Sequence, residues 1–288
     1  MAAASSTSES SAAPAATGSA IRANDLLTIG AMAILAYLIS SFVHEGLGHG
    51  LASLIVGAPI QHVTSLDLAS DLSHVSPWAA RFVDAAGCLA QFIFAAIMYV
   101  IYRRTPASNP NWRFFTWLLY YINVIIPAGY MMALSFVPFG DWNAFVQGLS
   151  PESLWRVVFT AIGLALSLTA VFAWGVPQLN EFLGRDRAQR FRRAMQLTLA
   201  TYLIGSIVDT LAGVFNPDGA ILILISAGAA SFGGTFFLFW MGIFAGRRPP
   251  RAEPPAIPLT VTRGAGWLIA GAVGLLIYFA VLGPGVPR

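Results

Sequence analysis

Long apolar segments dominate this sequence and limit what it can fold into. Seven stretches are mostly apolar over roughly 20 residues or more, the length that a helix needs to cross the hydrocarbon core of a bilayer. They cover residues 25–57, 78–102, 114–138, 153–175, 195–215, 219–245 and 265–283. Only 10% of the 288 residues are charged, whereas about a quarter are charged in a typical soluble domain. The sequence therefore predicts an integral membrane protein, an all-α polytopic bundle of about six to seven transmembrane helices.

The spans follow one another so closely that no separate soluble domain fits between them. We therefore expect residues 25–288 to form a single transmembrane domain. Residues 1–24 differ, because they consist mainly of Ala, Ser, Thr, Pro and Gly with almost no large apolar side chains. Such a segment buries too little surface to offset the entropy of the chain, so we expect a disordered N-terminal tail.

Arginine is the basic residue of this chain, which contains no lysine, and its distribution predicts an orientation. Arginines gather in three loops, at residues 103–113, 185–193 and 247–263. With seven spans these loops all lie on one side, which the positive-inside rule makes cytoplasmic. The N-terminus would then be cytoplasmic in a cell membrane. The basic segment 181–193 is expected to form a helix lying on anionic lipid, and so short a segment does not indicate binding to nucleic acid.

One cluster of ionisable residues lies inside the first span. The segment His44-Glu45-Gly46-Leu47-Gly48-His49 places two imidazoles and a carboxylate in an apolar helix, where ionisable groups are costly and usually functional. Zinc hydrolases use the same set: two imidazoles bind Zn²⁺, and the glutamate takes a proton from water at the metal. The sequence therefore predicts a zinc site with His44 and His49 as ligands and Glu45 as the general base.

The two histidines are one residue further apart than in the usual H-E-x-x-H motif. Side chains five positions apart point roughly 140° away from each other on a regular α-helix, so they cannot share an ion. A π-bulge absorbs one extra residue, and Gly46, Gly48 and Gly50 make such a distortion inexpensive. We expect a π-bulge here. In the alternative, Glu45 and His49, which are four positions apart, bind the metal without the first histidine.

A zinc site needs a third protein ligand, and two aspartates beside glycines near span ends are candidates. Asp141 follows the third span in Gly140-Asp141-Trp142, and Asp218 opens the sixth in Asn216-Pro217-Asp218-Gly219. In the arginine-based topology both lie at the outer end of their spans. The first histidine lies 19 positions (44 − 25) past the start of its span, or roughly 28 Å along a helix, so it also lies towards the outer side. The depth of His44 in the membrane is therefore consistent with either aspartate as the third ligand.

Three elements in this order resemble the site-2 protease family of intramembrane zinc metalloproteases, over about residues 40–146. The first is the histidine–glutamate helix. The second, Ala86-Gly87-Cys88-Leu89-Ala90-Gln91, corresponds to an Ala-Gly-Pro-x-x-Asn stretch of the family. The third, Val137-Pro138-Phe139-Gly140-Asp141, corresponds to a proline-containing turn followed by Leu-Asp-Gly. This chain differs in its histidine spacing, in Cys88 and Gln91, and in having Gly-Asp-Trp in place of Leu-Asp-Gly.

The resemblance favours Asp141 over Asp218 as the third ligand. It implies a protease that uses Zn²⁺ and Glu45 to hydrolyse a peptide bond in a transmembrane segment of a substrate protein, within the lipid bilayer. Gln91 and Asn143 are candidates, by position, for contacts with the oxyanion or the substrate.

The sequence also allows two other functions. A catalytically inactive membrane scaffold or regulator of the same fold would suit the inserted residue and the altered Ala-Gly element. A proton-coupled transporter would use Asp84 and Asp209, two carboxylates inside the second and fifth spans.

Overall fold

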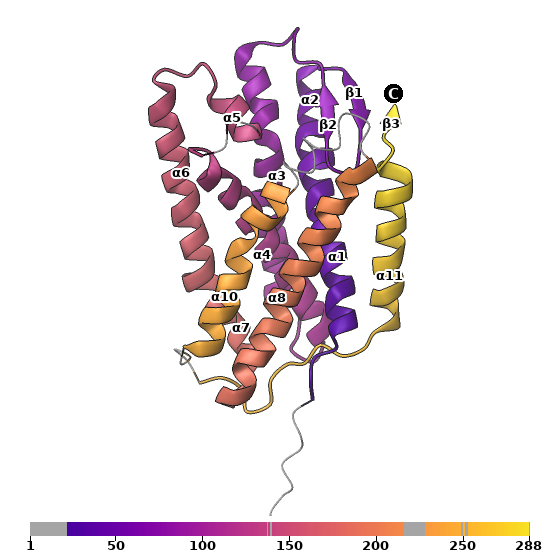
Figure 1. The fold of residues 1–288 in the computed structure, drawn as a ribbon, viewed down its shortest axis with the longest axis vertical. Helices are drawn as coiled ribbons and strands as arrows, with labels where there is room; N and C mark the ends of the chain where they lie inside the picture. Colours follow the sequence, from indigo (N-terminus) through magenta and orange to yellow (C-terminus); the bar gives the residue numbers. More distant parts are fainter. Residues whose placement is uncertain are drawn as a thin grey trace, which may run out of the picture.

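The computed structural model describes residues 22–136, 138, 140–215, 228–248, 250 and 253–287 (Figure 1). Its described residues include seven helices that are long and apolar enough to cross a membrane: Leu26–Val56, Pro77–Arg104, Pro110–Ala133, Glu152–Leu183, Arg187–Ala212, Ala229–Arg247 and Ala265–Leu282. These match the seven predicted spans, so the prediction of an all-α polytopic bundle is confirmed. Most of the expected tail, and Asp218, lie outside the described residues.

The first span is one continuous helix with an irregular centre. It comprises α1 (Leu26–Phe42), the π-helix η1 (Val43–Gly50) and α2 (Leu51–Val56). Asp25 caps its N-terminus, because its carboxylate accepts a hydrogen bond from the backbone N–H of Thr28 at 2.8 Å. Gly57 ends it with φ of +73°, the left-handed conformation that glycine adopts at helix C-termini.

A small sheet, which the sequence did not predict, packs beside the end of this span. Strands β1 (Ile60–Val63) and β2 (Leu68–Ser70) pair antiparallel, and the C-terminal strand β3 (Val286–Pro287) pairs with the other edge of β1. The order is β2-β1-β3, which leaves β2 at an edge. This edge strand contacts η1, since the backbone N–H of Leu68 donates to the Glu45 carboxylate at 3.1 Å.

The remaining spans and their connections complete the bundle. They are α3 (Pro77–Arg104), α4 (Pro110–Ala133), α5 (Asp141–Val146), α6 (Glu152–Thr169), η2 (Ala170–Gly175), α7 (Val176–Leu183), α8 (Arg187–Ala212), η3 (Gly213–Phe215), η4 (Ala229–Gly233), α10 (Phe236–Arg247), α11 (Ala265–Leu276) and η5 (Ile277–Leu282). Helix α4 is the central one, because 89% of its apolar window is buried within the protein, against 11% for the α11–η5 span. The core therefore forms around α4, with α11 at the periphery beside α1 (Figure 1).

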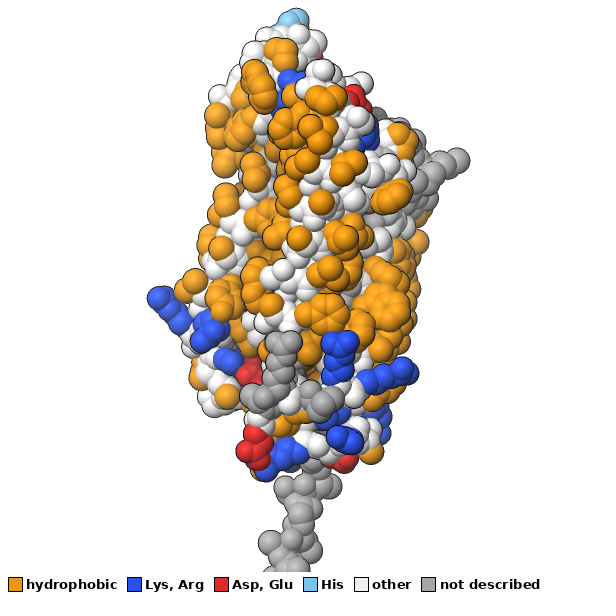
Figure 2. Space-filling model, turned by 90° about the vertical axis from the view of Figure 1, so that its left-hand side faces the viewer, with side chains coloured by type: hydrophobic (Ala, Val, Ile, Leu, Met, Phe, Trp, Pro, Cys, Tyr) orange, Lys and Arg blue, Asp and Glu red, His pale blue; other side chains and the backbone are white. Residues whose placement is uncertain are grey.

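Most arginines gather at one end of the bundle, the end at which α1 begins (Figure 1), below a broad apolar band (Figure 2). The segment 181–193 does not form the single interfacial helix that we expected there, because α7 ends at Leu183 and α8 begins at Arg187. Two of its arginines are buried instead. Arg190 donates to the carbonyl of Gly184 at 2.6 Å, and Arg193 donates to that of Phe182 at 2.7 Å. These guanidinium groups satisfy carbonyls near the end of α7, so they hold the loops together.

Candidate metal centre

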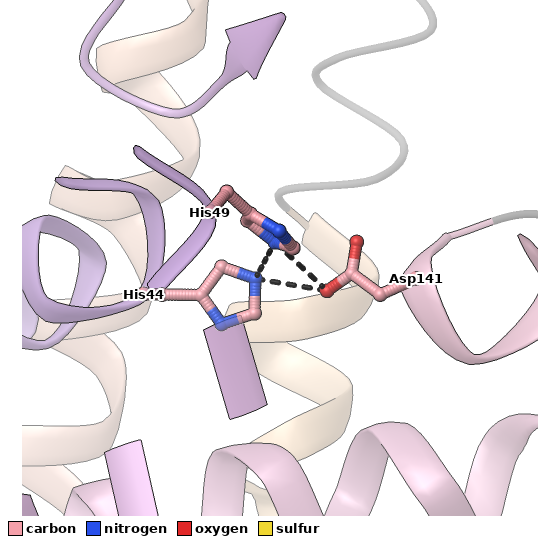
Figure 3. A group of neighbouring side chains, drawn as sticks. All are labelled: His44, His49 and Asp141. Carbon is pink, nitrogen blue, oxygen red and sulfur yellow. Dashed lines mark hydrogen bonds and ion pairs between the residues drawn. The ribbon is translucent and has the colours of Figure 1, made fainter. Parts of the chain in front are cut away.

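Three side chains from two distant parts of the chain converge (Figure 3). One of them belongs to α5, which lies towards the end of the bundle opposite the start of α1 (Figure 1). His44 and His49 come from η1, and Asp141 is the first residue of α5. The Nε2 atoms of the two imidazoles lie 3.1 Å apart. The Oδ2 atom of Asp141 lies 2.9 Å from Nε2 of His44 and 3.5 Å from Nε2 of His49. These three residues could hold a metal ion.

The π-helix explains how histidines five positions apart meet. In η1 the eight residues Val43–Gly50 follow the wider π spacing, which brings residues i and i+5 onto one face. The structure thus has the π-bulge that the spacing predicts. It places His44, and not Glu45, beside His49 and Asp141. Glu45 lies further out, with its Oε1 3.9 Å from Nε2 of His44.

Two glycines allow this π-helix to touch α3. A Cβ atom added to Gly48 would lie 2.4 Å from Cα of Gly87, so the two backbones are in direct contact. A Cβ atom on Gly87 would in turn lie 2.6 Å from Nε2 of both His44 and His49. The Ala-Gly element of the second span therefore has a physical role here: its glycine leaves room for the imidazoles.

A chain of buried hydrogen bonds sets the tautomer of His44. The backbone carbonyl of Leu119 can only accept, so the Asn123 amide group donates to it at 2.8 Å and turns its Oδ1 towards Ser40. The Ser40 hydroxyl donates to that oxygen at 3.1 Å and accepts from Nε2 of Gln91 at 2.9 Å. The Oε1 atom of Gln91 therefore faces Nδ1 of His44 at 3.1 Å, so Nδ1 carries the proton. A neutral His44 then presents a lone pair at Nε2.

His49 has the same tautomer for a simpler reason. Its Nδ1 lies 2.8 Å from the carbonyl oxygen of Val83, which can only accept. Burial acts to raise the pKa of the Asp141 carboxyl, but the positive charges of His49 and His44 in their protonated form outweigh it and hold that pKa well below its usual range. When both imidazoles are instead neutral, with their protons on Nδ1, Asp141 Oδ2 has no hydrogen-bond donor among the described residues. The three electron pairs then face one point, so a cation, either a proton or a metal ion, is needed between them.

The separations between these atoms fit a metal ion. Zinc binds nitrogen and oxygen at about 2.0–2.2 Å with tetrahedral angles, which places its ligand atoms about 3.3–3.5 Å apart. The observed separations are 3.1, 2.9 and 3.5 Å, so a small shift would admit the ion. Two imidazoles and a carboxylate are a donor set that both zinc and iron(II) accept. Three protein ligands would leave a fourth position open for water.

The cluster faces a cavity of about 380 Å³. Glu45 lines this cavity, and the Leu68 N–H of strand β2 holds its Oε2 while Oε1 points towards the cluster. Three more carboxylates line the cavity: Asp67 between β1 and β2, Asp84 of α3, and Asp209 of α8, whose Oδ1 accepts from the Ser41 hydroxyl at 2.7 Å. The small sheet therefore orients the predicted general base.

The other predicted contacts have different surroundings from those we expected. The side chain of Gln91 is almost fully buried and lies between His44 and Ser40, which favours a role in orienting the histidine over contact with an oxyanion. Asn143 accepts a hydrogen bond from Arg156 at 2.5 Å and is not among the residues lining the cavity. The alternative third ligand, Asp218, is outside the part of the chain that the structure describes.

Sequence reasoning missed the residues that support the ligands. Ser40 and Asn123 are both fully buried and complete the chain behind His44. A signal was present, because an amide in the middle of an apolar span needs a polar partner. The β2 strand, which holds Glu45, gave a weaker signal, since it is only three residues long.

Comparison with known proteins gives no further guide to function. No protein-family model matches the chain, and neither the curated proteins nor the solved structures contain a match.

Proposed function

We propose that this protein is a zinc-dependent intramembrane metalloprotease of the site-2 protease type. One observation carries the proposal: three electron-pair donors, on His44, His49 and Asp141, meet beside the Glu45 carboxylate inside a membrane bundle. Buried polar groups are costly in a bilayer unless they have a partner. A metal ion supplies that partner and turns the cluster into a hydrolytic site.

His44, His49 and Asp141 would hold the zinc ion. When bound, zinc supplies a Lewis acid that lowers the pKa of water and polarises a peptide carbonyl. Glu45 has one oxygen held by the Leu68 N–H, so its other oxygen is free to take a proton from the attacking water. The water oxygen adds to the carbonyl carbon, the C–N bond breaks, and Glu45 returns the proton to the leaving amine.

The proposed substrate is a transmembrane segment of another protein. The cavity lies between the first span and spans α3, α4 and α8. A substrate that lies in the bilayer is therefore next to the cavity, and a transmembrane peptide fits this position. A helix holds its carbonyl groups in internal hydrogen bonds. The segment must therefore unwind locally before its carbonyl group reaches the cluster.

Metal content tests the proposal first. Protein purified in detergent without added metal is expected to contain close to one zinc per chain. His49→Ala and Asp141→Ala are expected to lose it, because each removes one of three ligands. Glu45→Gln is expected to keep the zinc and to lose cleavage of a fluorescently labelled transmembrane peptide in the same detergent.

Three outcomes would count against the proposal. Wild-type protein that binds no metal even when zinc is offered would favour the inactive scaffold. Cleavage that persists in Glu45→Gln would reject the mechanism while leaving the metal site in place. Solute flux in proteoliposomes that depends on Asp209 would favour the transporter.

A further inference from the structure

A groove runs along the lipid-facing side of the bundle, away from the metal centre. It consists of two neighbouring cavities between α3, α4 and the α6–η2–α7 span. One, of about 320 Å³, is apolar and aromatic, and the other, of about 280 Å³, lies towards the basic end and contains Arg103. We call these two cavities together the lateral groove.

The two cavities share the same walls. On α3, Tyr99 lines the first and Tyr102 the second, and their rings are 6.5 Å apart. On α4, Tyr120 lines the first, and its ring lies 5.2 Å from that of Tyr99. On the third wall, Trp174 lines the first cavity and Gln178, one turn later, lines the second. The two cavities of the lateral groove therefore lie next to each other along the same three helices, with the packed tyrosine rings where they meet.

The length of the groove matches one leaflet of a bilayer. From Phe92 to Arg103 there are 11 positions (103 − 92), or roughly 16 Å along a helix. Half of a hydrocarbon core of about 30 Å is about 15 Å. Arg103 is the second-last residue of α3, at the basic end of the bundle. The groove thus reaches from the membrane surface to the middle of the membrane, the distance that one acyl chain covers.

The mouth of the groove has an uncompensated positive charge. Arg103 is exposed; its Nη1 donates to the Tyr99 hydroxyl at 3.1 Å, and its guanidinium lies 5.9 Å from that ring. Within the described part of the chain it has no acidic partner, whereas the nearby Arg113 pairs with Glu181 at 2.9 Å. A free guanidinium beside a tyrosine hydroxyl is suited to a phosphate group.

We propose that the lateral groove binds an anionic phospholipid from the leaflet at the basic end. One acyl chain lies along Phe92, Ala96 and Trp174, and the phosphate lies at Arg103. The small side chain of Ala96 leaves the room that the acyl chain fills. Because Phe92 directly follows Gln91 on α3, the bound lipid lies against the helix that supports His44.

Native mass spectrometry of the full chain in detergent tests this site, with phosphatidylglycerol and phosphatidylcholine of identical acyl chains as probes. One arginine near a membrane surface contributes enough to favour the anionic lipid about fivefold. Arg103→Gln is expected to abolish this preference. Arg104→Gln, a matched control whose arginine does not line the groove, is expected to keep it.

Filling the groove tests the acyl-chain half of the proposal. Ala96→Trp is expected to reduce binding of both lipids, and Ile97→Trp, at an exposed neighbour outside the groove, to leave it unchanged. Equal loss of the preference in Arg103→Gln and Arg104→Gln would overturn the site. So would unchanged binding in Ala96→Trp, or equally strong binding of glycerol phosphate, which has no acyl chains. Comparing two lipids on each variant separates these effects from a general loss of folding.

Discussion

Replacing Gln91 by leucine tests whether the hydrogen bonds behind His44 control metal affinity. Leucine keeps the helix and much of the volume, but it removes the acceptor for Nδ1–H of His44 and the donor to Ser40. A buried donor left without an acceptor costs about 1–3 kcal/mol. Loss of such an outer partner of a histidine ligand weakens metal binding by roughly 10–100-fold, or about 1.4–2.8 kcal/mol. We therefore expect Gln91→Leu to weaken zinc binding 10–100-fold without abolishing it, and the unpaired donor to lower the stability of the folded protein as well.

Zinc affinity is measured by competition with a chromophoric chelator in detergent. Gln91→Glu serves as the matched control, because a carboxylate still accepts from His44, and we expect it to retain or strengthen zinc binding. Asn123→Leu removes a partner one step further from the metal, so its effect is expected to be smaller. Wild-type affinity in Gln91→Leu would refute the role of this chain. So would a loss of affinity explained entirely by a lower melting temperature of the metal-free protein.

Three further predictions follow from the geometry. Gly87→Ala is expected to lower the zinc content measured by mass spectrometry, because its Cβ would lie 2.6 Å from the metal-facing nitrogens; full zinc content would contradict the close approach. Asp218→Ala is expected to keep its zinc, since the cluster already has a third donor, and loss of zinc would make Asp218 the ligand. Ser73→Cys is expected to react with a membrane-impermeant maleimide in intact cells, and Ala107→Cys only after lysis, with the buried Cys88 giving little background. If Ala107→Cys reacted in intact cells and Ser73→Cys only after lysis, the protein would have the opposite orientation.

The spans could be predicted from the sequence because each is a local property of about 20 consecutive residues. The π-bulge could also be predicted, since a two-histidine site with one residue too many has few solutions and glycines surround it. The position of the spans across the membrane could not identify Asp141, rather than Asp218, as the third ligand. Asp141 lies 92 positions (141 − 49) beyond His49, and only the packing of α5 against α3 decides where its carboxylate points. The sheet was missed because its strands are short and lie in a polar stretch.

Considered together, the polar residues inside the spans show which helices pack side by side, which none of them shows alone. Ser40 and Asn123 lie on different spans with no sequence relation, and either alone suggests only an internal hydrogen bond. In lipid, however, a buried polar side chain needs a partner on a neighbouring helix. The structure joins these two and Gln91 into one chain that ends at His44, a proposed ligand, and it joins Ser41 to Asp209 beside the same cavity. In a bundle of this kind, a polar residue on one span therefore predicts that a polar residue on another span packs against it. The cavity lies where these pairs come together.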